Sequence, residues 1–398
     1  MVTLNEAEQL LDRLSNKSVA IQPAHCVCVR NRHATCTACM DVCPTHALHI
    51  EKNQLNYNPD SCIDCGSCAN VCPTQALHTT ALPLMPYAQM LHEHITEQDE
   101  HRDMWVCCQK HPLANDNLEH LIVVPCLTHL DEAHYLLAAY YRIDLHVLHP
   151  DCTNCQNSTA GVVFENTYNS ALKLANQNNL NFSCQNHCEN TRSDTQYPLN
   201  HDRGGYSRRG FFSNMGNSLK HLGFTIADTA LESNFSRPQK QPTLAEALTV
   251  APGVLETFIP KRITLLLNIL YDVQNRSIEN NNTDLQQNKD ATDIFSTRLW
   301  GKVSIDETCR ACGMCARFCP TGALSYKGEE PKPGILFSAD SSKLAPKGPD
   351  HEFRCSDCIQ CRLCEDICPA KALHVDSHIS IADLLNLEPT IIKRHDTV

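Results

Sequence analysis

Long apolar runs are missing from the sequence, and so is the pattern of a secretory signal peptide. Its longest apolar runs, such as residues 263–270, are far shorter than the roughly 20 apolar residues that a helix needs to span a bilayer. The opening residues, MVTLNEAEQLLD, are acidic and amphipathic, without the basic start and apolar stretch of a secretory signal. We therefore predict a cytoplasmic protein with no membrane insertion.

Positive charge is scarce, and the common nucleotide-binding motifs are missing. The 33 lysines and arginines are outnumbered by 45 acidic residues, which gives a formal net charge of −12. This excess of negative charge argues against nucleic acid or an anionic membrane surface as a partner. The sequence contains no G-x-G-x-x-G after a strand, no G-x-x-x-x-G-K-[ST] and no H-E-x-x-H, so no nucleotide site or zinc hydrolase is indicated.

Cysteine, by contrast, is abundant. The chain has 25 cysteines among 398 residues, and in the cytosol clustered cysteines predict metal ligands rather than disulfides. A shortened run, CTACMDVCP, holds Cys36, Cys39 and Cys43. Three longer runs repeat the pattern C-x2-C-x2-C-x3-C-P, at Cys62, Cys65, Cys68 and Cys72, at Cys309, Cys312, Cys315 and Cys319, and at Cys358, Cys361, Cys364 and Cys368. This spacing is typical of proteins that bind [4Fe–4S] clusters.

Residues 23–80 and 301–376 resemble bacterial-type ferredoxins with two [4Fe–4S] clusters. In that family the fourth cysteine of each run ligates the other cluster, so that two runs interlock in one module. The resemblance implies a total of about four clusters. It also implies three complete ligand sets. In the first module, Cys62, Cys65 and Cys68 share a cluster with Cys43. In the second module, one cluster is held by Cys309, Cys312, Cys315 and Cys368, and the other by Cys358, Cys361, Cys364 and Cys319.

The ligands of the remaining cluster are incompletely specified. The family pattern implies Cys36, Cys39 and the distant Cys72, but His33 stands where the first cysteine is expected. We favour Cys28 as the fourth ligand, because a thiolate outcompetes imidazole for this iron site. Cys26 and His33 are alternatives, as is a three-iron cluster with an empty corner.

Another group of cysteines lies in the middle of the chain. Residues 101–160 contain the apolar runs MWVCC, LIVVPC and IDLHVLHPDC, the last two separated by a helical pattern, which predicts a small parallel α/β unit. A quartet is expected at the carboxyl edge of its sheet, formed by Cys107 (or Cys108), Cys126, Cys152 and Cys155. The quartet would suit an additional Fe–S cluster or a zinc ion. The alternatives are buried core cysteines or a redox-active dithiol of Cys152 and Cys155.

The predicted fold class is α+β with several domains. Two ferredoxin-like modules, at 23–82 and 301–376, flank the small parallel α/β domain at 101–160. The other expected parts are an N-terminal helix within 1–22, a polar loop-rich segment at 161–242, a helical segment at 243–274, a disordered linker at 275–298 and a C-terminal tail at 377–398.

These features predict an electron-transfer protein that relays single electrons between redox partners, as a subunit or partner of a larger oxidoreductase. Its negative charge favours docking to basic patches on those partners. Two other functions are compatible with the sequence. One is an oxidoreductase with its active site at the central cysteines, and the other is an Fe–S assembly or interaction factor for a redox enzyme.

Overall fold

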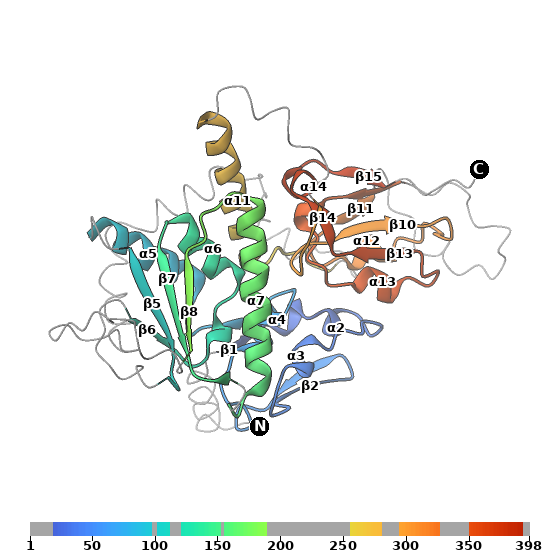
Figure 1. The fold of residues 1–398 in the computed structure, drawn as a ribbon. Coiled ribbons are helices and arrows are strands. Elements are labelled where there is room, and N and C mark those ends of the chain that lie inside the picture. The colour runs from blue at the N-terminus through green and yellow to red at the C-terminus, as the bar shows by residue number, and fades with distance from the viewer. Residues whose placement is uncertain are drawn as a thin grey trace, which may run out of the picture.

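The computed structural model describes residues 19–97, 102–111, 121–152, 155–188, 255–280, 294–326 and 350–392. Three parts are distinct in Figure 1, where the first cysteine-rich module is blue, the central sheet cyan to green and the second cysteine-rich module orange to red. The helix expected within 1–22 and most of the expected linker lie outside the described residues. No helix of the described ranges is long and apolar enough to cross a membrane.

The first module is a small α+β unit. Its first and last strands along the sequence, β1 (Val19–Ile21) and β4 (Leu77–Thr79), pair antiparallel, and β2 (Leu48–Glu51) and β3 (Gln54–Tyr57) form a hairpin. The short helices are η1 (Pro23–His25), α2 (Val27–Arg30), α3 (Ala38–Asp41) and α4 (Ser67–Val71). The helix α4 begins after Gly66, whose φ of 78° is in the left-handed region, and it ends before the Cys72–Pro73 step.

The second module repeats this plan. Its strand β10 (Lys302–Ile305) pairs antiparallel with β13 (Leu373–Asp376), and the short helices α12 (Met314–Phe318) and α13 (Leu363–Ile367) follow the two cysteine loops. Arg362 has φ 57° at the N-cap of α13, the position that glycine occupies before α4 and α12. The remaining elements are β9 (Ile294–Ser296), β11 (Leu324–Tyr326), β12 (His351–Phe353), η8 (Cys355–Asp357), β14 (His378–Ser380), α14 (Ile381–Leu385) and β15 (Thr390–Ile392).

The central part is a parallel four-stranded sheet of order β6-β5-β7-β8. Its strands are β5 (Asp103–Cys108), β6 (Leu121–Val124), β7 (Asp144–His149) and β8 (Cys184–Cys188). The packing helices are α5 (Leu84–Glu97), α6 (Glu132–Tyr140), α7 (Ser158–Gln177) and α11 (Lys261–Asn280), and η3 (Leu127–His129) follows β6. The predicted parallel sheet is confirmed. The unit extends beyond residue 160, because the helix α7 follows and β8 adds a fourth strand beside β7.

A buried polar network joins the three parts. Glu132, at the start of α6, is fully buried, and its carboxylate accepts hydrogen bonds from Arg298 at 2.5 and 2.7 Å. Arg298 also donates to the side chain of Asn70 in α4 at 2.8 Å. From α11, Arg262 donates to the carbonyl oxygens of Asn70 and Cys72, both at 3.0 Å. The network therefore contacts the first module, the central domain and the segment that leads into the second module.

A second carboxylate belongs to the same region. Asp131 is the N-cap of α6, accepting from the backbone of Ala133 at 3.0 Å, and it is paired with His134 at 2.9 Å. Burial opposes its ionisation, but the charges of His134, Arg262 and Arg298 outweigh burial and lower the pKa of Asp131 to about 2. Asp131 therefore stays ionised and keeps α6 capped at neutral pH.

We expect Arg298→Met to leave Glu132 buried and uncompensated, and to lower the free energy of unfolding by about 3–5 kcal/mol. The measurement is the midpoint of anaerobic urea unfolding of the cluster-loaded protein. Lys302→Met is the matched control, because its pair with Asp383 at 2.9 Å is half exposed and should contribute less than about 1 kcal/mol. Equal effects of the two changes would contradict the role given to the buried network.

Candidate iron–sulfur centres and central cysteines

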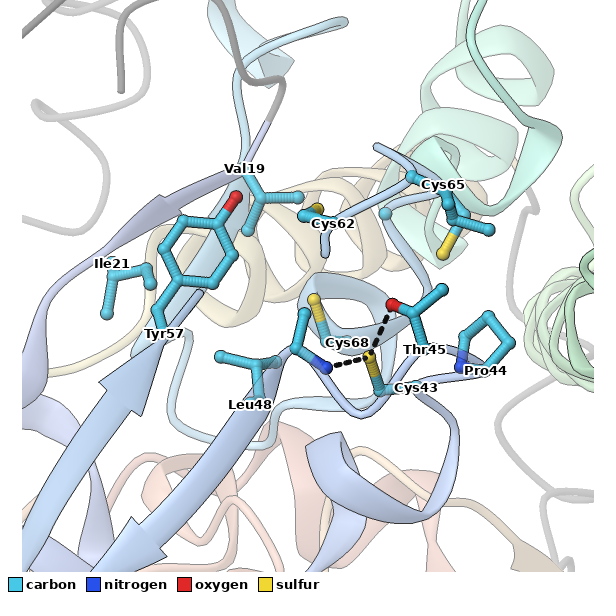
Figure 2. Close-up of a pocket in the computed structure, with 13 residues that line it drawn as sticks. Val19, Ile21, Cys43, Pro44, Thr45, Leu48, Tyr57, Cys62, Cys65 and Cys68 are labelled. Carbon is cyan, nitrogen blue, oxygen red and sulfur yellow. Dashed lines mark hydrogen bonds between the residues drawn. The ribbon is translucent and has the colours of Figure 1, made fainter. Parts of the chain in front are cut away.

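Four cysteines of the first module line one cavity. They are Cys43, Cys62, Cys65 and Cys68, the set that the ferredoxin resemblance implies for one cluster. Figure 2 shows these four side chains around the same space, with Val19, Leu48 and Tyr57 forming an apolar wall. The amide of Ala47 donates to Cys43 Sγ at 3.3 Å, and the amide of Asp64 donates to Cys62 Sγ at 3.3 Å. Such amide–sulfur hydrogen bonds stabilise thiolates and set the reduction potential of a bound cluster. We call these four cysteines the outer first set.

A second cavity has the same construction in the other module. It is lined by Cys309, Cys312, Cys315 and Cys368, together with Met314 and Leu373. The amide of Ala372 donates to Cys368 Sγ at 3.3 Å, and His351 Nε2 lies 3.6 Å from Cys315 Sγ. This outer second set therefore gathers the cysteines that the resemblance implies for one cluster of the second module.

A third group of four thiols lies between this cavity and the first module. Its members are Cys319, Cys358, Cys361 and Cys364, and we call it the inner second set. Burial raises the pKa of Cys358 to about 12. Nearby Cys355 is also buried, but its Sγ faces the carbonyl oxygen of Gly301 at 3.7 Å.

The inner first set contains Cys36, Cys39 and Cys72, and the structure bears on its fourth member. Cys28 is buried in α2 and its Sγ donates to the carbonyl oxygen of Cys36 at 3.3 Å. Cys26 is also buried, and a hydrogen bond joins the Cys26 and Cys28 thiols. Burial raises the pKa of Cys36 and of Cys39, and Cys72 and Cys26 are among the neighbouring thiols that raise both further, so Cys26 lies near these two cysteines as well. His33 is exposed instead, and its Nε2 accepts from Arg32 at 3.2 Å.

The chemistry of these donors fits iron–sulfur clusters. Burial raises the pKa of both Cys39 and Cys315 to about 12, so without a metal these thiols stay protonated at neutral pH. Bound iron stabilises thiolates and releases the protons, so loading is favoured as pH rises. Within the described residues, no three His, Cys, Asp or Glu side chains are grouped closely enough to hold a single metal ion. A cubane spreads its four thiolates over four separate corners.

The four sets follow one another through the molecule. Three buried thiols show which sets are neighbours. Burial raises the pKa of each of them, and a thiol from a different set raises the same pKa further, so the two sets lie close enough to interact electrostatically. The three pairs are Cys68 with Cys39, Cys361 with Cys36, and Cys364 with Cys315. The resulting order is outer first, inner first, inner second and outer second.

The central cysteines are divided between the two faces of the sheet. Cys108 packs in the main core together with Met104 and Val106, whereas Cys107 packs with Trp105 in a separate small cluster. This division follows from the alternation of side chains along β5. Cys126 and Cys155 are electrostatic neighbours of Cys108, so these three thiols lie together and Cys107 points away from them.

The loop after β6 packs directly on a cysteine loop of the first module, which the sequence did not indicate. The hydroxyl of Thr128 donates to the carbonyl oxygen of Cys65. His129 contacts the carbonyl oxygen of Asp64 through Nε2 at 3.0 Å and Thr79 Oγ1 through Nδ1 at 2.5 Å. No local sequence pattern predicts this contact, because its partners are about 60 residues apart.

We expect Gly66→Ala to disrupt this contact. A Cβ at Gly66 would lie 2.7 Å from the His129 ring, and the φ of 78° adds a strain of about 1–2 kcal/mol. Iron content should fall by up to about four atoms per chain, since the loop carries ligands of the outer first set. Gly322→Ala is the control, because it has a similar φ of 72° but its nearest neighbour is 3.7 Å away. Full iron content in Gly66→Ala would contradict the expectation.

We expect Cys28→Ala to disturb the inner first cluster. Loss of one ligand should give a three-iron form or an empty site, so iron should fall by about one to four atoms per chain. Iron analysis and EPR of the purified protein measure this. Cys26→Ala should retain full iron. The reverse result would assign the ligand to Cys26.

The comparisons with known proteins agree with this geometry. The family model described as the 4Fe-4S dicluster domain matches twice, at residues 12–76 and 308–372. No significant match to a curated protein or to a solved structure was found. Each match covers the cysteines of one module, so the chain carries two 4Fe-4S dicluster domains.

Proposed function

We propose that this protein relays single electrons along one continuous series of four [4Fe–4S] clusters, held by the four cysteine sets. The clusters, when bound, supply the one-electron chemistry. The protein contributes the thiolate ligands, the burial and the fixed separation of the sites. The observation that carries the proposal is the docking of the two modules through the loops of their inner sets.

This docking joins polar and apolar groups. From the inner first loop, Thr35 donates to the carboxylate of Asp366 through its amide at 2.8 Å and its hydroxyl at 2.9 Å. Asp366 lies in α13, between Cys364 and Cys368. Leu363 and Ile367, on the same helix, are buried in the core of the first module. The inner sets are therefore held next to one another, as electron transfer between modules requires.

A cation lies at the same junction. Arg30, on α2, is among the charged neighbours of Cys319 and Cys361. Its guanidinium donates to the carbonyl oxygen of Glu256 at 2.8 Å and lies 5.6 Å from the centre of the Phe258 ring. A positive charge beside thiolate-bound clusters offsets their negative charge and raises their reduction potential. Arg30 thus favours electron residence at the inner clusters.

The ligands in this proposal are sixteen cysteines, with Cys28 completing the inner first set. They are Cys28, Cys36, Cys39, Cys43, Cys62, Cys65, Cys68, Cys72, Cys309, Cys312, Cys315, Cys319, Cys358, Cys361, Cys364 and Cys368. We further propose a cytoplasmic setting, in which a donor protein and an acceptor protein dock near opposite ends of the series. The net charge of −12 favours basic surfaces on both.

We expect the anaerobically purified protein to contain about sixteen irons per chain. The reduced protein should show EPR signals broadened by magnetic interaction between neighbouring clusters, including the two inner clusters. Cys361→Ser should remove up to about four irons and abolish the interaction across the module boundary, while that between the outer and inner first clusters remains. Cys355→Ser is the control and should match the parent protein. A spectrum of non-interacting clusters in the parent protein would contradict a continuous series.

A further inference from the structure

The central cysteines lie where an open α/β sheet builds its sites. In the order β6-β5-β7-β8, the chain moves from β5 to β6 on one side and then to β7 on the other, so the direction reverses between β5 and β7. Ligand sites of such sheets form at the carboxyl ends of the strands on either side of this reversal. Cys108 ends β5, and Cys152 and Cys155 follow the end of β7.

Cys152 and Cys155 are joined by a backbone turn, and Cys155 lies close to a cation. The amide of Cys155 donates to the carbonyl oxygen of Cys152 at 3.2 Å, a turn that brings the two cysteines of the C-x-x-C sequence together. Lys110 Nζ lies 3.6 Å from Cys155 Sγ. Burial raises the pKa of Cys108 to about 11, and Cys126 and Cys155 are among the charges that raise it further. Cys108 Sγ faces the carbonyl oxygen of Pro125, the residue directly before Cys126, at 3.9 Å. Cys108 therefore lies beside the start of the η3 turn that carries Cys126.

Cys126 connects this group to the outer first set. It directly precedes the η3 turn, whose Thr128 and His129 contact the backbone of Cys65 and Asp64. Cys126 is also an electrostatic neighbour of Cys65. The sulfur-rich path therefore runs from the outer first cluster site through Cys126 and Cys108 to Cys155.

We propose that Cys152 and Cys155 form a reversible disulfide that exchanges electrons with the outer first cluster, along a path on which Cys126 lies. The protein would thus collect single electrons from its clusters and hold them as a pair in a dithiol. This inference rests on the proposed electron-transfer function. A dithiol suits the geometry better than a zinc site, because no three potential ligands of the described residues are grouped for one ion.

The step balances as a two-electron reduction. The Cys152–Cys155 S–S bond would break as two electrons reach it one at a time from the donor protein by way of the clusters, and two protons, one of them from solvent, would complete the two thiols. The ammonium of Lys110 is placed to deliver one proton to Cys155 Sγ. The electrons come from the donor protein that reduces the clusters. The dithiol in turn passes the pair to a disulfide substrate by thiol–disulfide exchange.

The test is a reductive titration of the cluster-loaded protein. The protein is first equilibrated with glutathione disulfide under argon and then titrated with reduced methyl viologen, with cluster reduction followed by absorbance. We expect Cys155→Ser to take up about two electrons fewer per chain than the parent protein, at unchanged iron content. Mass spectrometry after alkylation should find the Cys152–Cys155 disulfide before titration and two alkylated thiols after it. Cys107→Ser is the matched control and should behave as the parent. Cys107 lies on β5 next to Cys108, but its side chain is on the opposite face of the sheet.

A second variant tests the path. Cys126→Ser should slow reduction of the disulfide by viologen-reduced clusters, while its reduction by dithiothreitol and the total electron uptake stay unchanged. Equal uptake in the parent and Cys155→Ser would overturn the proposal, and so would a loss of iron in Cys152→Ser or Cys155→Ser, which would make these residues cluster ligands. Failure of the electron-transfer function would look different, because the modules would then lack iron while the disulfide still formed.

Discussion

The arrangement of the molecule depends on one buried ion pair. The fully buried carboxylate of Glu132 belongs to the central domain, and Arg298, which compensates its charge, belongs to the segment entering the second module. A buried carboxylate without a partner is strongly unfavourable, so the fold gains stability when these two segments meet. Because Arg298 also bonds to Asn70 of the first module, the same pair fixes all three parts and, with them, the separation of the cluster sites.

Cluster binding and module docking reinforce one another. The helix α13 buries Leu363 and Ile367 in the first module. The same helix carries Cys364, and Cys368 follows its last residue, so it also holds the proposed ligands of two clusters. The buried thiols are poor anions without a metal, because burial opposes their ionisation. Loading would replace these neutral thiols by iron-bound thiolates, so protons are released at the interface when a cluster binds.

The sequence predicted the parts whose information is local. The C-x2-C-x2-C-x3-C-P spacing and the left-handed glycine at Gly66 define the cysteine loops, and the apolar runs before Cys108 and Cys126 predicted parallel strands. The helix α7 was not expected, although its buried residues Ala160, Val163 and Ala171 recur at helical spacing among polar residues. Arg362 occupies a left-handed position without any glycine to indicate it. The contacts of His129 with the Asp64–Gly66 loop and of Arg298 with Glu132 could not be predicted, since they join segments far apart in the sequence.

The wide spacing of the Glu132–Arg298 pair along the chain has a consequence for biosynthesis. The two residues are 166 positions apart, so a nascent polypeptide displays Glu132 to water until the ribosome has made the later segment. During that interval the amino-terminal cysteine loops have no second module against them. Only the completed polypeptide can pack the inner loops against one another, so the junction between the modules forms after both have been synthesised.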